Sequence, residues 1–315
     1  MPVNIVLGNT DNTLTVSNFD SLVSGTGTDT ITVTAALTGA TVNLGAGTDS
    51  LTLANATNSL TVSNTETLTG GTGADTITLA TTLTGMTLDL GAGADKLTLA
   101  NVANTGTVSN VETITGNAAA DTITLGTAIT GGTINLGAGT DSLTLANGTN
   151  SATVSNTETI TGGTGADTIT LGAAITAGTI DLGAGTDTLI LGNFANSATV
   201  SNVETLTGGT GTDTITLATA LTGMTVNLGT GTDTLILANA VNTGTVSNVE
   251  TITGNAGADT ITLATAITAG VIDLAAGTDA LTLGNFANSA TVSNTETLTG
   301  GTGTDAITLA TAITA

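Results

Sequence analysis

The stretch DTITLATTLTGMTLDLGAGA (75–94) is followed directly by DKLTLANVANTGTVSNVETITGNAAA (95–120). Each half opens on Asp and then alternates apolar with polar residues, as Ile77 and Leu79 do on either side of Thr78. A period of two over four or five residues, interrupted by Gly-rich turns, is typical of short β-strands. The dense Gly, Thr and Asn, without a 3.6-residue period, argue against helix. This stretch therefore predicts strands joined by tight turns.

The same pattern recurs every 46 residues along the whole chain. Two Asp series and one Glu series mark this period, and Asp20 takes the first position of the Glu series. The first Asp series is Asp29, Asp75, Asp121, Asp167, Asp213, Asp259 and Asp305, the second is Asp49, Asp95, Asp141, Asp187, Asp233 and Asp279, and the Glu series is Glu66, Glu112, Glu158, Glu204, Glu250 and Glu296. The two halves of each unit align from their Asp as far as Leu90 and Asn110, after which the second half carries six extra residues, VETITG. We therefore expect each unit to form two coils, a shorter one such as 75–94 and a longer one such as 95–120.

Identical short strands at a fixed spacing cannot bury their apolar faces alone, so they stack. The expected fold is an all-β, parallel β-solenoid of about seven 46-residue repeats, with residues 1–315 forming a single domain and no separate globular part. Ile, Leu and Val would line the interior as apolar ladders, and Thr would point outward.

Composition limits the function. The formal net charge is −23 and Lys96 is the only basic side chain, which excludes nucleic acid because phosphate binding needs cations on the protein. No segment reaches the ~18 apolar residues of a membrane helix, so membrane insertion is not expected. The chain has no His, Cys, Tyr, Trp or Arg. Catalysis would lack its usual acids, bases and nucleophiles, and we expect the protein not to be an enzyme.

Four segments carry a recognisable nonapeptide: GGTGADTIT at 70–78 and 162–170, GGTGTDTIT at 208–216 and GGTGTDAIT at 300–308. They match the pattern G-G-x-G-x-D-x-U-x, where U is a large aliphatic residue, and so the chain resembles the RTX (haemolysin-type calcium-binding) repeat family. In that family, glycines allow a tight turn whose carbonyls, together with the Asp, bind calcium between successive turns. The resemblance implies a calcium-binding β-roll with ligands on both Asp series.

A cation is also expected on physical grounds. With one Asp per coil, the Asp side chains would form a single ladder along one edge. Two unit charges ~5 Å apart repel by about 1 kcal/mol in water and about 3 kcal/mol at an effective dielectric of 20. Ca²⁺ suits such a ladder because it prefers oxygen ligands and tolerates irregular geometry. The predicted metal ligands are Asp29, Asp49, Asp75, Asp95, Asp121, Asp141, Asp167, Asp187, Asp213, Asp233, Asp259, Asp279 and Asp305.

Other interpretations of the polar residues stay open. The alternative for the Asp side chains is that they cap turns through backbone hydrogen bonds. The Glu66 series is expected to be solvated or to stabilise turns. A recurring Asn series, Asn64, Asn110, Asn156, Asn202, Asn248 and Asn294, is expected to be structural, since stacked Asn amides hydrogen-bond along such a rod.

These features favour a structural protein outside the cell or on its surface. The leading hypothesis is a filament or surface layer that assembles head-to-tail from copies of this chain through open solenoid ends. The alternatives are a spacer segment of a secreted RTX-type adhesin and an ice-binding surface, because outward Thr in T-x-T, such as Thr76 and Thr78, resembles the arrays of ice-binding solenoids.

Overall fold

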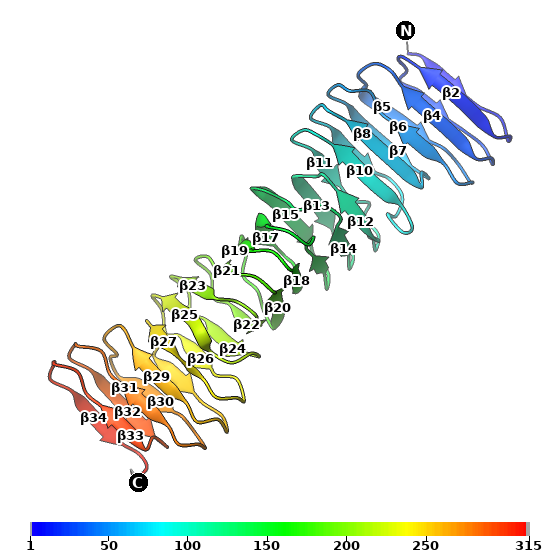
Figure 1. Ribbon diagram of the computed structural model, residues 1–315. Helices are drawn as coiled ribbons and strands as arrows, with labels where there is room; N and C mark the ends of the chain where they lie inside the picture. The colour runs from blue at the N-terminus through cyan, green and yellow to red at the C-terminus, as the bar shows by residue number, and fades with distance from the viewer. Residues whose placement is uncertain (1, 313–315) are drawn as a thin grey trace. The chain divides into compact units, whose positions relative to one another are not determined.

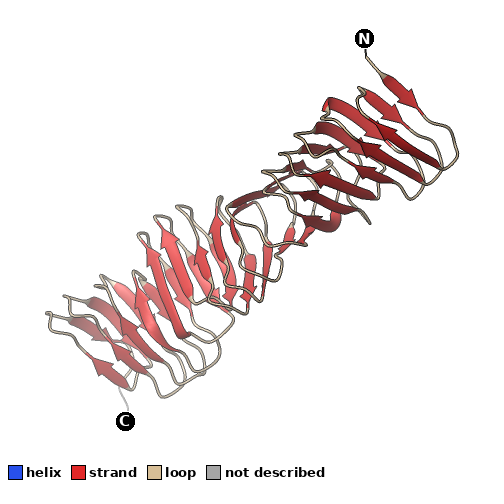
Figure 2. Cartoon of the chain, turned by 45° about the horizontal axis from the view of Figure 1, so that its top comes forward, coloured by secondary structure: helices blue, strands red, loops and turns tan. Residues whose placement is uncertain are grey.

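The computed structural model describes residues 2–312. Within that range every regular element is a strand, and Figure 2 shows only strands and loops. The described residues form no helix that is long and apolar enough to cross a membrane. The chain divides into two compact units, residues 1–159 and 160–315.

In each unit, odd-numbered strands form one parallel sheet and even-numbered strands form the other, so that the chain alternates between the two (Figure 1). We call these the odd sheet and the even sheet. The odd sheet of the first unit comprises β1 (Asn4–Val6), β3 (Ser21–Val23), β5 (Thr38–Asn43), β7 (Ser59–Ser63), β9 (Thr76–Leu79), β11 (Lys96–Thr98), β13 (Thr113–Asn117), β15 (Gly132–Gly137) and β17 (Ser151–Ser155). Its even sheet comprises β2 (Asn12–Val16), β4 (Asp29–Val33), β6 (Ser50–Thr52), β8 (Thr67–Gly71), β10 (Thr87–Gly91), β12 (Thr105–Ser109), β14 (Thr122–Leu125) and β16 (Ser142–Thr144).

The second unit has the same organisation. Strand β18 (Thr159–Gly163) begins at the division between the units. The odd sheet comprises β19 (Thr168–Leu171), β21 (Thr188–Ile190), β23 (Thr205–Gly209), β25 (Thr222–Gly229), β27 (Thr243–Ser247), β29 (Thr260–Leu263), β31 (Ala280–Thr282) and β33 (Thr297–Thr299). The even sheet comprises β20 (Gly178–Gly183), β22 (Ser197–Ser201), β24 (Thr214–Leu217), β26 (Thr234–Ile236), β28 (Thr251–Thr253), β30 (Gly270–Asp273), β32 (Ser289–Ser293) and β34 (Ala306–Leu309).

Strand register shows how the repeat maps onto the turns. From β6 to β8 the paired residues advance by 17, as Ser50 pairs with Thr67, and from β8 to β10 they advance by 20, as Thr67 pairs with Thr87. The residue that follows Thr67 by 46 positions is Thr113, which begins β13. One repeat therefore contains five strands, which make two and a half turns of the two-sheet coil.

The expected division of each repeat into one shorter and one longer coil is thus wrong, although the all-β parallel β-solenoid is confirmed. The six residues read as an extension of the second coil contain the start of a fifth strand, β13. An odd number of strands per repeat has a direct consequence: β8 lies in the even sheet and β13 in the odd sheet. Equivalent residues of successive repeats within a unit therefore lie on opposite sheets.

The interior consists of apolar ladders, as expected. On the even sheet of the first unit, Ile31, Leu51, Leu68, Leu88 and Val108 stack in register and are at most 1% exposed. Burying a side chain of this size contributes about 1.5–3 kcal/mol. Because each strand from β3 to β32 buries only one to three apolar side chains, stability comes from stacking successive turns and not from any single strand.

Candidate functional site

Four polar residues connect successive turns at the start of β7, β9, β11 and β13. The main-chain N–H and the Nδ2 of Asn58 both donate to Asp75 Oδ1, at 2.8 Å each. The Asp75 N–H donates to Asp95 Oδ1 at 2.6 Å, and the Asp95 N–H donates to Glu112 Oε2 at 2.8 Å. We call such a set, Asn–Asp–Asp–Glu, an acidic row. Each carboxylate accepts a main-chain N–H of the preceding turn, which is the turn-capping role that we considered as the alternative to metal binding.

Acidic rows recur once per repeat and change sheet each time. The first unit has complete rows at the starts of even strands (Asn12, Asp29, Asp49, Glu66 and Asn104, Asp121, Asp141, Glu158) and of odd strands (Asn58, Asp75, Asp95, Glu112). The second unit has Asp167, Asp187 and Glu204 on odd strands, Asn196, Asp213, Asp233 and Glu250 on even strands, Asn242, Asp259, Asp279 and Glu296 on odd strands, and Asn288 with Asp305 on even strands.

The predicted single ladder of Asp along one edge is therefore wrong. Loops leading into odd and even strands lie at opposite edges of a two-sheet coil, and two and a half turns per repeat move each row to the other edge. The structure brings the Asp residues together in pairs separated by 20 positions, such as Asp75 with Asp95. It does not bring together the Asp that are separated by 26 positions, such as Asp95 and Asp121, because these head strands of different sheets.

The Asp carboxylates are buried and only partly satisfied. From Asp29 to Asp279, all twelve members of the two series are at most 1% exposed, whereas Asp305 is half-buried. In Asp29 the second oxygen accepts a hydrogen bond from Ser24 Oγ. In ten others, Oδ2 is buried without a hydrogen-bond partner: Asp49, Asp75, Asp95, Asp121, Asp141, Asp187, Asp213, Asp233, Asp259 and Asp279. A buried charged oxygen without a partner is costly, and a proton or a cation would remove this cost.

The second Asp of each pair titrates unusually. The pKa of Asp95 is raised to about 6, chiefly by burial and also by the charges of Asp75 and Glu112, while the hydrogen bond from the Asp75 N–H opposes the shift. The pKa of Asp233 is raised to about 6 for the same reasons, with Asp213 and Glu250 as the neighbours. The pKa values of the equivalent groups Asp49, Asp141, Asp187 and Asp279 shift in the same direction.

The metal-free protein should consequently be more stable at about pH 5 than at about pH 8. The pKa of Asp95 and Asp233 is 3.8 in the unfolded chain and about 6 in the folded protein. At pH values between these two, both side chains are protonated when the protein is folded and lose the proton when it unfolds. The free energy of unfolding thus falls as pH rises through this window and stays low above it. Thermal melts in chelator at the two pH values measure the difference. Equal melting temperatures would show that these carboxylates carry no buried charge.

The surroundings of the Asp pairs suit calcium. A Cβ placed on Gly93 would lie 2.5 Å from the Gly73 carbonyl oxygen and 2.8 Å from Asp95 Oδ1, so only glycine allows these two oxygens to approach the main chain here. Gly185, Gly231 and Gly277 stand in the same relation to Asp187, Asp233 and Asp279. Within residues 2–312 no three acidic side chains converge as a metal-binding group, so main-chain carbonyls would have to complete the ligand set. Ca²⁺ accepts such mixed carboxylate and carbonyl oxygens.

Two members of the acidic row were not predicted as parts of the site. The Glu66 series stabilises turns, which was one of the two roles expected for it. Each Glu Oε2 accepts the main-chain N–H of an Asp, at 2.7 Å for Glu66 and Asp49. The Asn58 series was missed altogether. Its sequence signal is the spacing of 17 between Asn58 and Asp75, which equals the shorter advance of the strand register.

A second polar ladder lies at the other end of the strands. Asn64, with φ of 51°, donates from Nδ2 to Asn43 Oδ1 of the turn below at 2.8 Å, and Asn110 donates to Asp89 Oδ1 at 2.6 Å. The expected hydrogen bonding along the rod is confirmed, although the acceptor is an Asn or Asp outside the Asn64 series. The left-handed conformation, which Asn adopts readily, explains why Asn recurs there.

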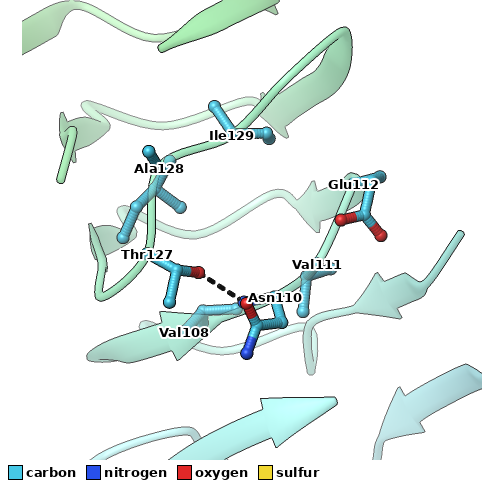
Figure 3. Close-up of a pocket in the computed structure, with 8 residues that line it drawn as sticks. Val108, Asn110, Val111, Glu112, Thr127, Ala128 and Ile129 are labelled. Atoms are coloured by element: carbon cyan, nitrogen blue, oxygen red, sulfur yellow. Dashed lines mark hydrogen bonds between the residues drawn. The ribbon is translucent and has the colours of Figure 1, made fainter. Parts of the chain in front are cut away.

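The hollows of the surface are small or chemically simple. One near Asn110 and Glu112 has a volume of about 10 Å³, which is the space for a single water. There the Asn110 N–H donates to Thr127 Oγ1 at 2.7 Å and ties the turn to the next loop (Figure 3). A larger hollow of about 380 Å³ in the second unit is lined by Thr, Leu, Ala, Gly, Asn285 and Phe286, none of which titrates near neutral pH.

Comparison with known proteins agrees with this geometry. The family model of the RTX calcium-binding nonapeptide repeat (4 copies) matches residues 62–79, 154–174 and 247–263. No curated protein and no solved structure matches the chain. The three matched segments contain Asp75, Asp167 and Asp259, the first Asp of three acidic rows. RTX nonapeptide repeats are calcium-binding repeats. The three matched segments therefore carry RTX calcium-binding nonapeptide repeats, within a chain that folds as a parallel β-solenoid.

Proposed function

We propose that the twelve buried Asp residues of the two series, Asp29 to Asp279, bind Ca²⁺ and that the bound ions hold neighbouring turns of a structural protein together. The thirteenth predicted ligand, Asp305, is half-buried and stays outside the proposed sites. The observation that carries this proposal is the set of buried Asp Oδ2 atoms without a hydrogen-bond partner, exemplified by Asp75 and Asp95. When bound, the cation supplies the positive charge that these carboxylates lack. Equilibrium dialysis of the metal-free protein against calcium tests it: several ions should bind per chain, and an absence of bound calcium at millimolar concentration would refute it.

The role that fits best is mechanical and not catalytic. The side chains beside the Asp pairs are the Asn and the half-buried Glu of the acidic rows, and these already take part in hydrogen bonds. The hollow near Asn110 and Glu112 is too small for a substrate, and the hollow of about 380 Å³ is lined by residues that are neither acids nor bases. An extracellular or cell-surface location fits the calcium requirement, since modules outside the cell are saturated even when their affinity is only ~10⁻⁴–10⁻³ M.

Within this role, we infer assembly of the chain head-to-tail into filaments or a surface layer. Among the described strands, β1 pairs only with β3 and β34 pairs only with β32, so each leaves one edge unpaired. Apolar side chains are exposed there, with Val6 79% and Leu309 47% accessible. An unpaired parallel edge can accept a strand from another copy, and a head-to-tail contact propagates as a fibre. Residues 313–315, at the C-terminal side of the expected junction, lie outside the described residues.

Negative-stain imaging tests the assembly. Micromolar protein with calcium should form long fibres. Deletion of residues 1–9 removes β1, the strand that would pair with the C-terminal edge of another copy, and should therefore abolish the fibres. A matched deletion is not available at the interior, so the control is the full chain in chelator. Uniform short particles of the full chain in calcium would contradict head-to-tail assembly and favour the alternative of a spacer within a longer adhesin.

Ice binding remains a second candidate because Thr side chains form regular arrays. On the odd sheet, Thr76 and Thr78 are exposed, and Thr113 and Thr115 lie in register with them two strands away. Lys96 interrupts this array between them. Outward Thr is also favourable strand material without any ligand. A thermal-hysteresis measurement on ice crystals decides this candidate, since an ice-binding face would produce hysteresis and a plain strand surface would not.

A further inference from the structure

The acidic rows are discontinuous along each edge. After Glu112, the next two residues at the same strand position are Gly132 and Ala152, because Thr113 pairs with Thr133 and Gly132 pairs with Ala152. Both are buried. The row on the even strands ends in the same way, with Met86 and Gly106 after Glu66. Each pair of Asp is therefore separated from the next pair on its edge by uncharged positions.

The separation weakens the charge interaction between successive pairs. On the even sheet of the first unit, Asp49 heads β6 and the next Asp, Asp121, heads β14, four strands away. Four strand spacings amount to about 19 Å. At an effective dielectric of 20, two unit charges interact by about 0.9 kcal/mol at this distance, against about 3 kcal/mol at ~5 Å. Occupancy of one pair therefore affects the next pair much less than the two Asp of a pair affect each other.

Within a pair, by contrast, the two carboxylates act as one unit. Asp75 and Asp95 occupy successive turns, the N–H of the first donates to Oδ1 of the second, and each keeps a buried Oδ2 without a partner. The Gly73 carbonyl oxygen lies beside Asp95 Oδ1 at the bare Cα of Gly93. Glu112 differs from the two Asp because it is only half-buried and Oε2 accepts the Asp95 N–H, so it positions the turn that carries the pair.

Resting on the calcium binding proposed above, we propose that each pair of Asp on successive turns, such as Asp75 with Asp95, is one independent calcium site, so that each repeat carries its own ion. Two carboxylates neutralise one Ca²⁺, and the uncharged positions beyond the Glu of each row separate the site from the next one. The chain would then hold six such ions, at Asp29/Asp49, Asp75/Asp95, Asp121/Asp141, Asp167/Asp187, Asp213/Asp233 and Asp259/Asp279.

Two double variants distinguish a modular arrangement from a continuous ladder. Asp75→Asn with Asp95→Asn removes two Asp of one pair, whereas Asp95→Asn with Asp121→Asn removes two Asp that also follow one another in the two Asp series but belong to different pairs. Asn is a suitable replacement because Asn58 occupies the equivalent position one turn earlier in the same row. Equilibrium dialysis with elemental analysis counts the bound ions, and circular dichroism in calcium checks that each variant folds.

The expected counts are six ions for the parent, five for each single variant, five for Asp75→Asn/Asp95→Asn and four for Asp95→Asn/Asp121→Asn. Equal losses in the two double variants, or a loss of two ions from the first, would overturn the modular arrangement while leaving calcium binding intact. A parent chain without bound calcium would instead refute the proposed function itself. If a double variant fails to fold, the single variants still decide the point: Asp75→Asn and Asp95→Asn must each remove one ion, and a loss of two from either overturns it.

Discussion

Removal of calcium is expected to lower the melting temperature of the protein by tens of degrees or to unfold it. Ten buried Asp Oδ2 atoms have no hydrogen-bond partner, and each pair brings two negative charges to successive turns. At ~5 Å and an effective dielectric of 20, the repulsion within one pair is about 3 kcal/mol, against a total stability of about 5–15 kcal/mol for a typical domain. A cation that binds only the folded chain removes this cost and adds its own binding free energy.

Circular dichroism at increasing temperature, with calcium and with excess chelator, measures the effect. The first control restores calcium after chelation, which should restore both the β-sheet spectrum and the melting temperature. The second control adds NaCl to the metal-free protein, because screening by monovalent salt acts weakly on buried charges and should recover little. An unchanged spectrum and melting temperature after thorough chelation would contradict a structural role for calcium.

Most of the fold was predictable because its strands have period-two apolar patterns. Ile77 and Leu79 are buried and Thr76 and Thr78 are exposed, as the alternation requires. The number of strands per repeat was not predictable in the same way. Strand β13 carries a single buried apolar side chain, Ile114, between Thr and Gly residues, so its sequence reads as an extended loop. Only pairing with β11 and β15 makes it a strand.

The candidate site was predictable by residue type but not by arrangement. The Asp period identified every Asp of the acidic rows, and the nonapeptide identified the cation. Their grouping depends on whether a repeat contains an even or an odd number of strands. Because the strand equivalent to β13 was not recognised, a single ladder was predicted where the structure has pairs of Asp on alternate edges. The alternation also places Asp75 on the same inward side as Ile77 and Leu79, and Asp75 is fully buried. What the sequence did not show is the partner of its carboxylate, because Asp75 Oδ1 accepts its hydrogen bonds from Asn58 of the preceding turn.

Replacement of all thirteen Asp by Asn should make the fold independent of calcium. An Asn Oδ1 can accept the same main-chain N–H that each Asp Oδ1 accepts, such as the Asp75 N–H at position 95. The Nδ2 group can donate to loop carbonyls, as Asn58 Nδ2 does to the carbonyl oxygens of Ala54 and Ala56. The substitution thus removes the buried charge and puts an amide where the cation would bind. In chelator this variant should melt tens of degrees above the metal-free parent, and calcium should not change its melting temperature.

The matched control replaces the same thirteen residues by Ala. Ala also removes the charge, but it leaves each main-chain donor without its acceptor, at a cost of about 1–3 kcal/mol for every buried group. The Ala variant should therefore not fold in either condition, and the contrast between Asn and Ala separates the charge of the Asp side chains from their hydrogen bonding. If the Asn variant is unfolded in chelator like the parent, the repulsion of buried carboxylates is not what calcium relieves. The ion would then act chiefly through its bonds to the loop carbonyls beside Gly73 and Gly93, which no change at the Asp positions can replace.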